Sequence, residues 1–126
     1  MVELKAMTED NFIDAFNLKL ASGQEAFVSH PIRSLAQAYV YRNQCQPFGI
    51  YAEETMVGYV MVIYDYDIPE YDIWHMMIDE QMQGRGYGNK ALERVIDYMW
   101  KSHASCPRGL AFLTVISFAD RIPGLS

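Results

Sequence analysis

The sequence predicts a single α/β domain over residues 1–126. Three observations predict this fold class. Segments with the period of strands alternate with segments that have the period of amphipathic helices, a glycine-rich turn joins one such strand to one such helix, and no linker or repeat divides the chain. The length is sufficient for one hydrophobic core. The expected order of elements is β-α-α-β-β-β-α-β.

The first half of the chain is expected to contain one strand and two helices. Residues 2–7 predict the strand. Thr8 is a suitable N-cap for the first helix, which should end at Ser22-Gly23. The second helix is expected over residues 32–42 and should end before Pro47. The apolar residues expected to face the core are Phe12, Ile13, Phe16 and Leu20 in the first helix, and Leu35, Ala38 and Tyr39 in the second.

The second half is expected to be mostly strands, followed by one long helix. Residues 48–53 and 56–64 predict a hairpin around Glu54-Thr55, and residues 71–79 predict the next strand. The segment 57–64 is apolar on both faces, which is typical of a central strand covered on both sides. Residues 89–101 predict an amphipathic helix and residues 110–117 a last strand. The buried stripe of the helix is expected to be Leu92, Val95, Ile96 and Met99.

The segment Gln83-Gly84-Arg85-Gly86-Tyr87-Gly88 is the most informative motif. It joins an expected strand to the N-terminus of an expected helix, where backbone N–H groups lack intrahelical partners and the helix dipole favours negative charge. Glycines let this backbone turn sharply and approach a ligand closely. We therefore expect a phosphate-binding loop. The alternative is that the glycines only shape a tight turn.

The spacing in this loop excludes two better-known phosphate motifs. The dinucleotide fingerprint needs a third glycine where Asn89 stands, and the P-loop needs Gly-Lys-Ser/Thr where the chain has Asn89-Lys90-Ala91. The chain does satisfy Gln/Arg-x-x-Gly-x-Gly/Ala, through Gln83, Gly86 and Gly88. With the preceding residues 76–82, this segment resembles the pyrophosphate loop of the GCN5-related N-acetyltransferases (GNAT). The resemblance covers residues 2–101 and is closest to the bacterial spermine/spermidine acetyltransferases.

The resemblance implies a mixed sheet that splays open beside the loop, with acetyl-CoA as co-substrate. The pyrophosphate would bind loop amides, and the pantetheine arm would pair like an extra strand with Met77-Ile78. A backbone N–H there would polarise the thioester carbonyl. Arg85 would add a charge-assisted contact to phosphate or else face solvent. The implied cofactor-binding residues are Met77, Ile78, Gln83, Gly84, Arg85, Gly86, Tyr87, Gly88 and Asn89.

The acceptor implied by the resemblance is an amine, which must lose a proton before it attacks. An alkylammonium has a pKa of about 10.4, so a base is needed. Glu70 and Asp72 are candidate bases, acting through water as is usual in the family, and His75 is the alternative. Strand alternation predicts two opposite faces, one formed by Tyr71, Ile73 and His75 and the other by Glu70, Asp72 and Trp74. A surface charge or a core histidine remains the plainer interpretation of each candidate.

The charge distribution favours a small cationic amine as partner. The net charge of −6 argues against nucleic acid. The segment 43–84 contains no Lys or Arg, and it carries Glu53, Glu54, Asp65, Asp67, Glu70, Asp72, Asp79 and Glu80. Such a region would attract a polycation, or it is only a solvated acidic face. Five interleaved aromatic residues could line a slot for the cationic chain, although we expect most to be packing residues: Tyr59, Tyr64, Tyr66, Tyr71 and Trp74.

The remaining features predict a soluble cytoplasmic protein. Apolar segments are too short to span a bilayer, and no signal segment begins the chain. Cys45 and Cys106 have no metal-ligand spacing, so we expect two structural thiols and no metal. No membrane partner is expected.

The resemblance weakens after Ser102. The family continues with a strand, a helix that carries a general-acid tyrosine, and a closing pair of strands, which residues 108–126 do not match. We therefore expect a truncated or altered C-terminus, an exposed sheet edge, and a homodimer or higher homo-oligomer. Four functions remain open: acetylation of spermidine or spermine, acetylation of an aminoglycoside or a protein N-terminus, CoA binding without turnover, and a structural or interaction role.

Overall fold

The computed structural model describes residues 1–20, 30–67 and 70–102. Its elements, in chain order, are β1 (Val2–Ala6), α1 (Phe12–Phe16), α2 (Pro31–Val40), β2 (Cys45–Ala52), β3 (Thr55–Asp65), β4 (Glu70–Ile78), the 3₁₀ helix η2 (Glu80–Met82) and α3 (Tyr87–Ser102). The predicted α/β class and the order of elements up to α3 are confirmed. The strand expected at residues 110–117 lies outside the described residues.

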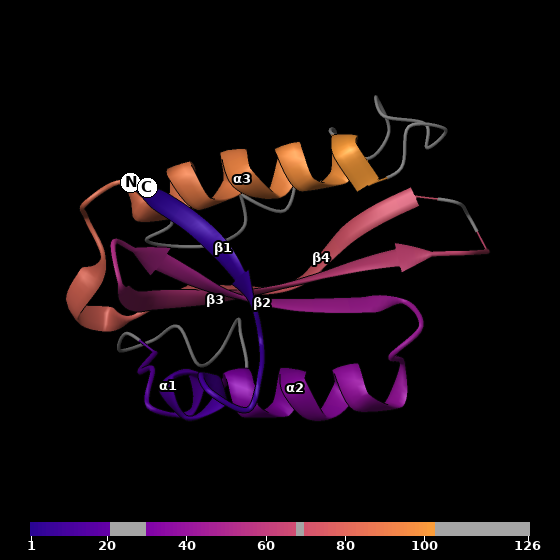
Figure 1. The fold of residues 1–126 in the computed structure, drawn as a ribbon, viewed down its shortest axis with the longest axis horizontal. Helices are drawn as coiled ribbons and strands as arrows, with labels where there is room; N and C mark the ends of the chain where they lie inside the picture. Colours follow the sequence, from indigo (N-terminus) through magenta and orange to yellow (C-terminus); the bar gives the residue numbers. More distant parts are fainter. Residues whose placement is uncertain (21–29, 68–69, 103–126) are drawn as a thin grey trace.

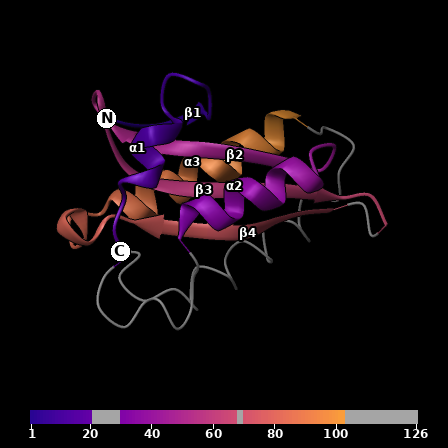
Figure 2. The same cartoon turned by 90° about the horizontal axis from the view of Figure 1, so that it is seen from below.

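The four strands form one sheet in the order β1-β2-β3-β4. Figure 1 shows α3 on one face of this sheet and α1 with α2 on the other, and Figure 2 views the sheet from the side of α1 and α2. The central strand β3 is buried from Val57 to Ile63, as its two-sided apolar pattern predicts. All pairs among the described strands are antiparallel, so the parallel pair of a mixed sheet is not among them.

The sheet separates two hydrophobic cores. The α3-face core contains Phe48, Ile50, Val57, Val60, Val62, Tyr71, Ile73, Met76, Ile78, Ala91, Val95 and Met99, with Val2 from β1. The α1/α2-face core contains Ala15, Leu18, Ala38, Cys45, Tyr59, Met61, Ile63 and Met77. From Tyr59 to Ile63 the buried side chains of β3 alternate between the two cores, and this alternation fixes the register of β3 between its neighbours.

The predicted inner face of the first helix is wrong. The helix ends after Phe16, with Asn17 as C-cap, so its pattern does not extend to Leu20. Ala15 and Leu18 are the buried residues of this region. The side chains expected inside are about half exposed, at 43%, 53% and 54% for Phe12, Ile13 and Phe16. A helix this short is oriented by its flanking contacts rather than by its own apolar stripe.

The second helix begins one residue earlier than predicted, and its inward face agrees with the prediction at Ala38 and, partly buried, at Leu35, but not at Tyr39. Pro31 occupies its first turn, where a missing N–H costs nothing, and His30 caps the helix by accepting a hydrogen bond from the Ile32 amide. The buried residues are Pro31, Ser34 and Ala38. Tyr39, expected to face the core, is 73% exposed, because the stripe with spacing 31-34-38 turns it toward solvent.

The third helix packs on the sheet through Gly88, Ala91, Val95 and Met99. The predicted Val95 and Met99 are therefore confirmed, whereas Leu92 and Ile96 are only partly buried. Arg94 Nε donates to the Val2 carbonyl at 3.2 Å, which links α3 to β1.

Two β-bulges interrupt the sheet. Ile50 pairs with Gly58 but Tyr51 pairs with Met56, so Val57 is an extra residue in β3. Met61 pairs with His75 but Val62 pairs with Ile73, so Trp74 is an extra residue in β4. Bulges bend a strand and redirect its side chains. Here they bracket the buried segment from His75 to Ile78, which leads into the glycine-rich loop.

Candidate functional site

The glycine-rich loop has the backbone conformation that only glycine adopts without strain. Gly84 and Gly86 both have φ of +80°. A Cβ at either position would meet nothing within 4 Å, so open space lies beside both residues. Gly88 differs, because it is buried within α3, where a small residue lets the helix approach the sheet. Two of the three glycines therefore shape an open loop, and the third serves packing.

The amides of this loop find no acceptor within the described part of the chain. Among the described residues, the backbone N–H groups of residues 84–89 donate no hydrogen bond, and the first helical bond at this end runs from Lys90 N–H to the Gly86 carbonyl at 3.2 Å. Arg85 and Lys90 are exposed beside these amides. Free N–H groups, the positive end of the α3 dipole and two cations together form an arrangement suited to an anion.

Gln83 supports the loop from within the protein. Its side-chain Nε2 donates to the Ile78 carbonyl at 3.1 Å, which closes the turn that contains η2. This contact gives Gln83 a structural part in shaping the loop. Arg85, Tyr87 and Asn89 lie at the start of α3, half-buried or exposed, next to the free amides.

The end of β4 presents alternate peptide groups to its two sides. The Asp79 N–H donates to the Val57 carbonyl at 2.8 Å, so Asp79 faces β3. In an antiparallel ladder the peptide groups of alternate residues point the same way. Those of Met77 therefore point to β3, whereas those of Ile78 lie on the outer edge of β4. Of the two residues that the sequence assigns to pantetheine, Ile78 has the outward-facing groups.

Asp79 joins this loop to the chain segment after α1. Its carboxylate accepts hydrogen bonds from the amides of Lys19 and Gln81, both at 3.0 Å, and the Glu80 N–H donates to the Lys19 carbonyl at 2.9 Å. A cavity of about 390 Å³ lies beside this junction. Its lining includes Asp14, Asn17, Leu18, Glu54, Thr55, Met56, Asp79, Gln81 and Met82. Sequence reasoning missed Asp79, which it counted only as one acid of the cation-free segment.

The predicted division of β4 into two faces is correct before the bulge but wrong at His75, because the bulge at Trp74 shifts the alternation by one residue. Tyr71 and Ile73 lie in the α3-face core. His75 pairs with Met61 and packs against the Tyr59 ring at a centroid distance of 5.2 Å, on the α1/α2 face. Asp72 pairs with Ile63, which is also on that face. The bulge therefore places all three candidate bases, Glu70, Asp72 and His75, on the same face of β4.

His75 lies in a buried polar group under α2. It is 5% exposed. Its neighbour Tyr59 is fully buried and shares a hydrogen bond of 3.0 Å with the Ser34 hydroxyl. Burial raises the pKa of Tyr59 to about 12, and burial also raises the pKa of the Cys45 thiol. These shifts keep the phenol and the thiol neutral at ordinary pH, so neither supplies a charge to the site.

Glu70 and Asp72 lie at the end of β4 far from the loop. At a strand rise of about 3.3 Å per residue, Asp72 is about 20 Å from Ile78 along the strand. Asp72 Oδ1 accepts from the Ile73 amide at 2.7 Å. The Oε2 atom of Glu70 is buried and accepts no hydrogen bond from the described residues.

The five aromatic residues do not line one slot. Tyr59 and Tyr71 are buried in different cores, on opposite faces of the sheet. Tyr64 stacks edge-on with Tyr66 and with Tyr71, at 5.1 and 5.0 Å between ring centroids. Trp74 is 42% exposed and contacts the Tyr41 ring at 5.6 Å. The expectation that most of these rings serve packing is confirmed.

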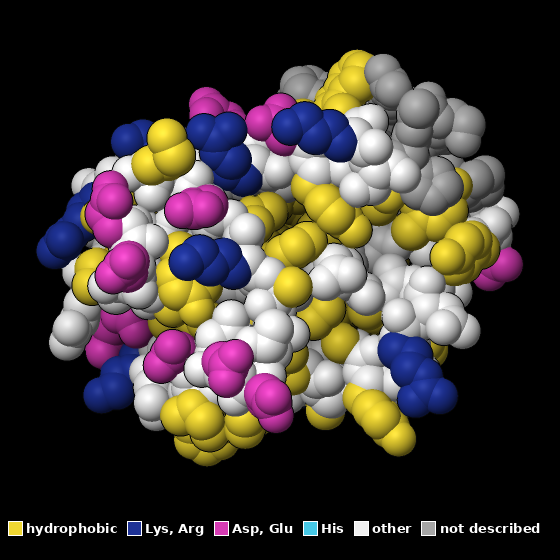
Figure 3. Space-filling view, in the orientation of Figure 1, with side chains coloured by type: hydrophobic (Ala, Val, Ile, Leu, Met, Phe, Trp, Pro, Cys, Tyr) yellow, Lys and Arg dark blue, Asp and Glu magenta, His cyan; other side chains and the backbone are white. Residues whose placement is uncertain are grey.

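The surface in the view of Figure 1 is not one-signed. Figure 3 shows acidic and basic side chains interspersed on this face, with hydrophobic side chains gathered below α3. On this face, therefore, the acids do not form the continuous negative surface that the cation-free segment suggests.

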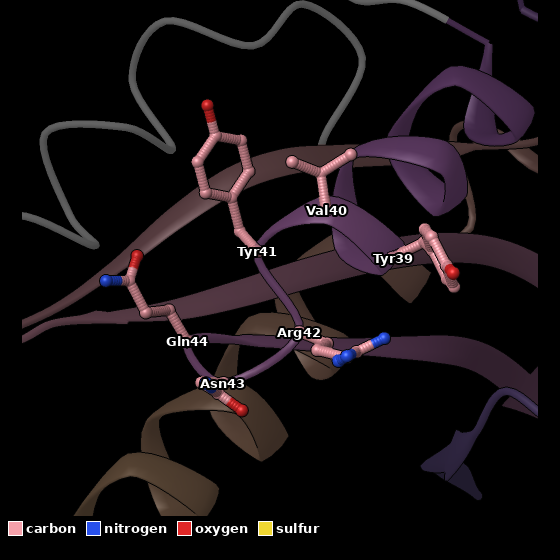
Figure 4. Close-up of a pocket in the computed structure, with 6 residues that line it drawn as sticks. All are labelled: Tyr39, Val40, Tyr41, Arg42, Asn43 and Gln44. Carbon is pink, nitrogen blue, oxygen red and sulfur yellow. The ribbon is translucent and has the colours of Figure 1, made fainter.

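A second cavity, of about 560 Å³, lies at the C-terminal end of α2. Figure 4 shows its six lining residues, with Tyr41 and Val40 directed to one side and Arg42 toward Tyr39. The Arg42 guanidinium lies 5.5 Å from the centroid of the Tyr39 ring. The Tyr64 N–H donates to the Gln44 carbonyl, so this cavity is near the start of β4 and far from the glycine-rich loop.

Neither a cluster of metal ligands nor a membrane-spanning helix occurs among the described residues. Within residues 1–20, 30–67 and 70–102, no group of three or more His, Cys, Asp or Glu residues is placed to hold a metal ion. No helix in these ranges combines the length and the apolar character needed to cross a membrane.

The comparison with protein families identifies the class. Residues 12–120 match the acetyltransferase (GNAT) family, and the chain belongs to this family. The match extends to residue 120, beyond the point where the loop and strand motifs alone placed the end of the resemblance. A spermine/spermidine N(1)-acetyltransferase from Bacillus subtilis (strain 168) is 30% identical over 111 residues, which cover 78% of this chain and 68% of that protein.

Solved structures show the same fold. A chimera of the spermidine N-acetyltransferase SpeG from Vibrio cholerae with hSSAT has a TM-score of 0.59 at 19% identity, and the match covers 79% of this chain and 63% of that one. An acetyltransferase from Bacillus subtilis in complex with CoA has a TM-score of 0.54 at 16% identity, over 79% of this chain and 57% of that one. This chain thus spans less than two thirds of the length of both structures.

Proposed function

We propose that the protein is an acetyl-CoA-dependent N-acetyltransferase whose acceptor is a small polyamine such as spermidine or spermine. The observation that carries the proposal is the loop at residues 84–89. It combines two glycines at φ of +80°, open space beside both, and amides at the start of α3 that donate to none of the described residues. Family membership and the polyamine acetyltransferase from Bacillus subtilis support the choice of reaction and acceptor.

The residues present fit the diphosphate of acetyl-CoA. The amides of residues 84–89 would donate to its phosphate oxygens, and Arg85 and Lys90 would add positive charge. The outward peptide groups of Ile78 would pair with the pantetheine arm as a neighbouring strand does, with the Ile78 carbonyl using the lone pair that is not engaged by Gln83 Nε2. When bound, acetyl-CoA would supply an activated thioester for transfer to the amine. The Ile78 N–H is the donor best placed to stabilise negative charge on the acyl oxygen.

The acceptor is proposed to approach from the α1/α2 face. The α3 face of β4 is closed by apolar side chains, whereas the opposite face carries Glu70, Asp72 and His75. The buried Oε2 of Glu70, which has no donor among the described residues, would pair with an ammonium group of a long amine. Asp72 and Glu70 lie about 20 Å or more along β4 from Ile78, too far to take the proton from an amine at the acyl group through one water, so they would bind the distal charge of the amine. His75, three residues from Ile78, is then the proposed base, although it is buried.

A thiol-release assay tests the reaction. Purified protein is mixed with acetyl-CoA and a panel comprising spermidine, spermine, an aminoglycoside and a peptide with a free N-terminus. We expect thiol release above the amine-free rate with the polyamines, and a smaller response to the other amines. Calorimetric binding of CoA without thiol release would replace this proposal with the binding-only alternative. Absence of both binding and release would leave only a structural role.

A substitution in the loop tests the assignment of the phosphate site. Gly86→Asn adds a side chain in the open space beside the loop, while asparagine tolerates the left-handed conformation better than other non-glycine residues. We expect the affinity for CoA to fall about tenfold or more, while the thermal unfolding midpoint changes little. Gly86→Val adds bulk but also backbone strain, so its folding must be checked by circular dichroism. Unchanged CoA affinity in folded Gly86→Asn would refute the loop assignment.

Assembly and location stay predictions. We propose a cytoplasmic homodimer or higher homo-oligomer, as the sequence suggests. Gel filtration with light scattering at the assay concentration measures the mass directly, and the mass of a single chain would contradict this proposal.

A further inference from the structure

Gly58 is unusual for the position it occupies. It lies inside β3, between Val57 and Tyr59, in a strand that is otherwise rich in β-branched and large apolar residues. Glycine in a strand interior costs conformational entropy and contributes no side chain to the core, and it often marks a close approach of another backbone. Gly58 pairs with Ile78, the last residue of β4 and the one whose peptide groups face outward.

The space beside Gly58 is filled by the backbone of β4. A Cβ at this position would overlap the Met77 carbonyl oxygen, and it would lie 3.2 Å from Ile78 Cα and 2.9 Å from Ile78 Cδ1. The first two obstacles are main-chain atoms, which do not rotate away as a side chain does. β3 and β4 approach this closely because residue 58 has no side chain.

The close approach of β3 and β4 at Gly58 also determines the backbone direction at the outer edge of β4. The bulge residue Val57 directly precedes Gly58, and its carbonyl accepts from the Asp79 amide at 2.8 Å. The last peptide of β4 is therefore held between Gly58 and the Val57–Asp79 hydrogen bond. Any side chain at residue 58 would push the Met77 carbonyl away from β3 and rotate the following peptide. That rotation would redirect the Ile78 N–H and carbonyl.

We propose that Gly58 is a positioning residue for the acyl-donor site. By admitting the Met77 carbonyl, it sets the direction of the outward peptide groups of Ile78, to which the pantetheine arm would pair. This inference rests on the proposed function. It assigns a role in the site to Gly58, which lies one strand away from the bound ligand and does not contact it. The diphosphate loop at residues 84–89 is linked to this peptide through the hydrogen bond from Gln83 Nε2 to the Ile78 carbonyl, with η2 in between, so its response to a change at residue 58 should be much smaller than that of the pantetheine site.

Two ligands and a matched variant test this role. CoA carries both the diphosphate and the pantetheine arm, whereas adenosine 3′-phosphate 5′-diphosphate has the same nucleotide and diphosphate without the pantetheine arm. The variants are Gly58→Ala and Gly49→Ala. A Cβ at Gly49 would approach only side-chain atoms, Met56 Cε at 2.6 Å and Tyr51 Cε1 at 3.0 Å, and the Met56 methyl group can move. Affinities are measured by calorimetry on protein shown to be folded by circular dichroism.

We expect Gly58→Ala to weaken CoA binding about tenfold or more, which is the loss of one or two main-chain hydrogen bonds. Binding of the diphosphate fragment should stay within about twofold of wild type, and Gly49→Ala should retain both affinities. Unchanged CoA affinity in Gly58→Ala, or an equal loss for both ligands, would overturn the inference. Wild-type protein that binds neither ligand would instead overturn the proposed function, and the inference with it.

A second variant addresses the folding of Gly58→Ala. Ile78→Val removes the Cδ1 atom that a new Cβ would meet, and it leaves the overlap with the Met77 carbonyl in place. The double variant Gly58→Ala/Ile78→Val should therefore fold more readily than Gly58→Ala and still bind CoA weakly, relative to Ile78→Val alone. Recovery of full CoA affinity in the double variant would show that the side chain, and not the backbone position, was responsible.

Discussion

The two faces of the sheet differ in what they bury. The α3-face core is built from aliphatic, methionine and aromatic side chains, with Tyr71 its buried phenol. The α1/α2 face holds both of the buried polar residues of the described chain, Ser34 and His75, and the buried thiol of Cys45. Burying polar groups costs free energy unless they are hydrogen-bonded, and the 3.0 Å hydrogen bond between Ser34 and Tyr59 offsets that cost on the second face.

The two faces therefore have different roles: the α3 face supports the loop, and the α1/α2 face carries the candidate bases. The α3 face holds the long helix against the sheet, and so it fixes the start of that helix, where the loop amides donate to no residue that the structure describes. The α1/α2 face receives every candidate base, because the bulge at Trp74 turns His75 to the side of Asp72 and Glu70. Polar groups on one face of a strand, next to a bulge, are typical of a functional surface on a stable scaffold.

The largest expected effect is on the α3 face. Ile73→Ala removes a side chain that is 2% exposed and leaves a cavity, so we expect a loss of about 2–5 kcal/mol in the free energy of unfolding. Ile13→Ala makes the same chemical change on α1, where the side chain is 53% exposed, and should cost less than about 1 kcal/mol. Urea unfolding of both variants measures the difference. Equal losses would mean that the assignment of the two environments is wrong.

The same contrast explains what the sequence could predict. Strand positions and the open loop follow from local signals, namely the period of apolar residues and the glycines at 84 and 86. The bulge at Trp74 depends on how β4 pairs with β3, and one strand read alone carries no sign of it. The prediction of the face on which His75 lies was wrong for that reason. The sequence does show Gly58 as an isolated glycine in an apolar strand, which indicates a bulge or a close backbone approach. Which backbone approaches it is known only once the partner strand is known.

The second-largest effect is expected on the α1/α2 face, where a rise in pH should lower the stability through Tyr59. Burial raises the pKa of Tyr59 to about 12, above the value of about 10 for an exposed tyrosine. Between these two values the unfolded chain releases the proton and the folded chain keeps it, so stability falls as pH rises. The loss should approach about 2–3 kcal/mol near pH 12. Between pH 9 and about 12, we expect the free energy of unfolding of wild type to fall by about 2–3 kcal/mol more than that of Tyr59→Phe.

Unfolding midpoints in urea across this pH range give the comparison, because other tyrosines and lysines titrate equally in both proteins. Tyr59→Phe should also be less stable than wild type at pH 7, by about 1 kcal/mol, since Ser34 loses the 3.0 Å hydrogen bond. Parallel pH profiles for the two proteins would show that the Tyr59 hydroxyl is accessible to water.

The smallest effect is expected at Asp79, where the segment after α1 meets the loop that leads to α3. Asp79→Ala removes the acceptor for the Lys19 and Gln81 amides, and because the carboxylate is half-exposed we expect a loss of about 1 kcal/mol. Asp14→Ala removes a carboxylate from the same cavity wall and should change stability by less than about 0.5 kcal/mol. Amide hydrogen exchange identifies the cause, because only Asp79→Ala should speed exchange at Lys19 and Gln81. Exchange that is unchanged at both amides would mean that these two hydrogen bonds do not hold the N-terminal layer to the loop.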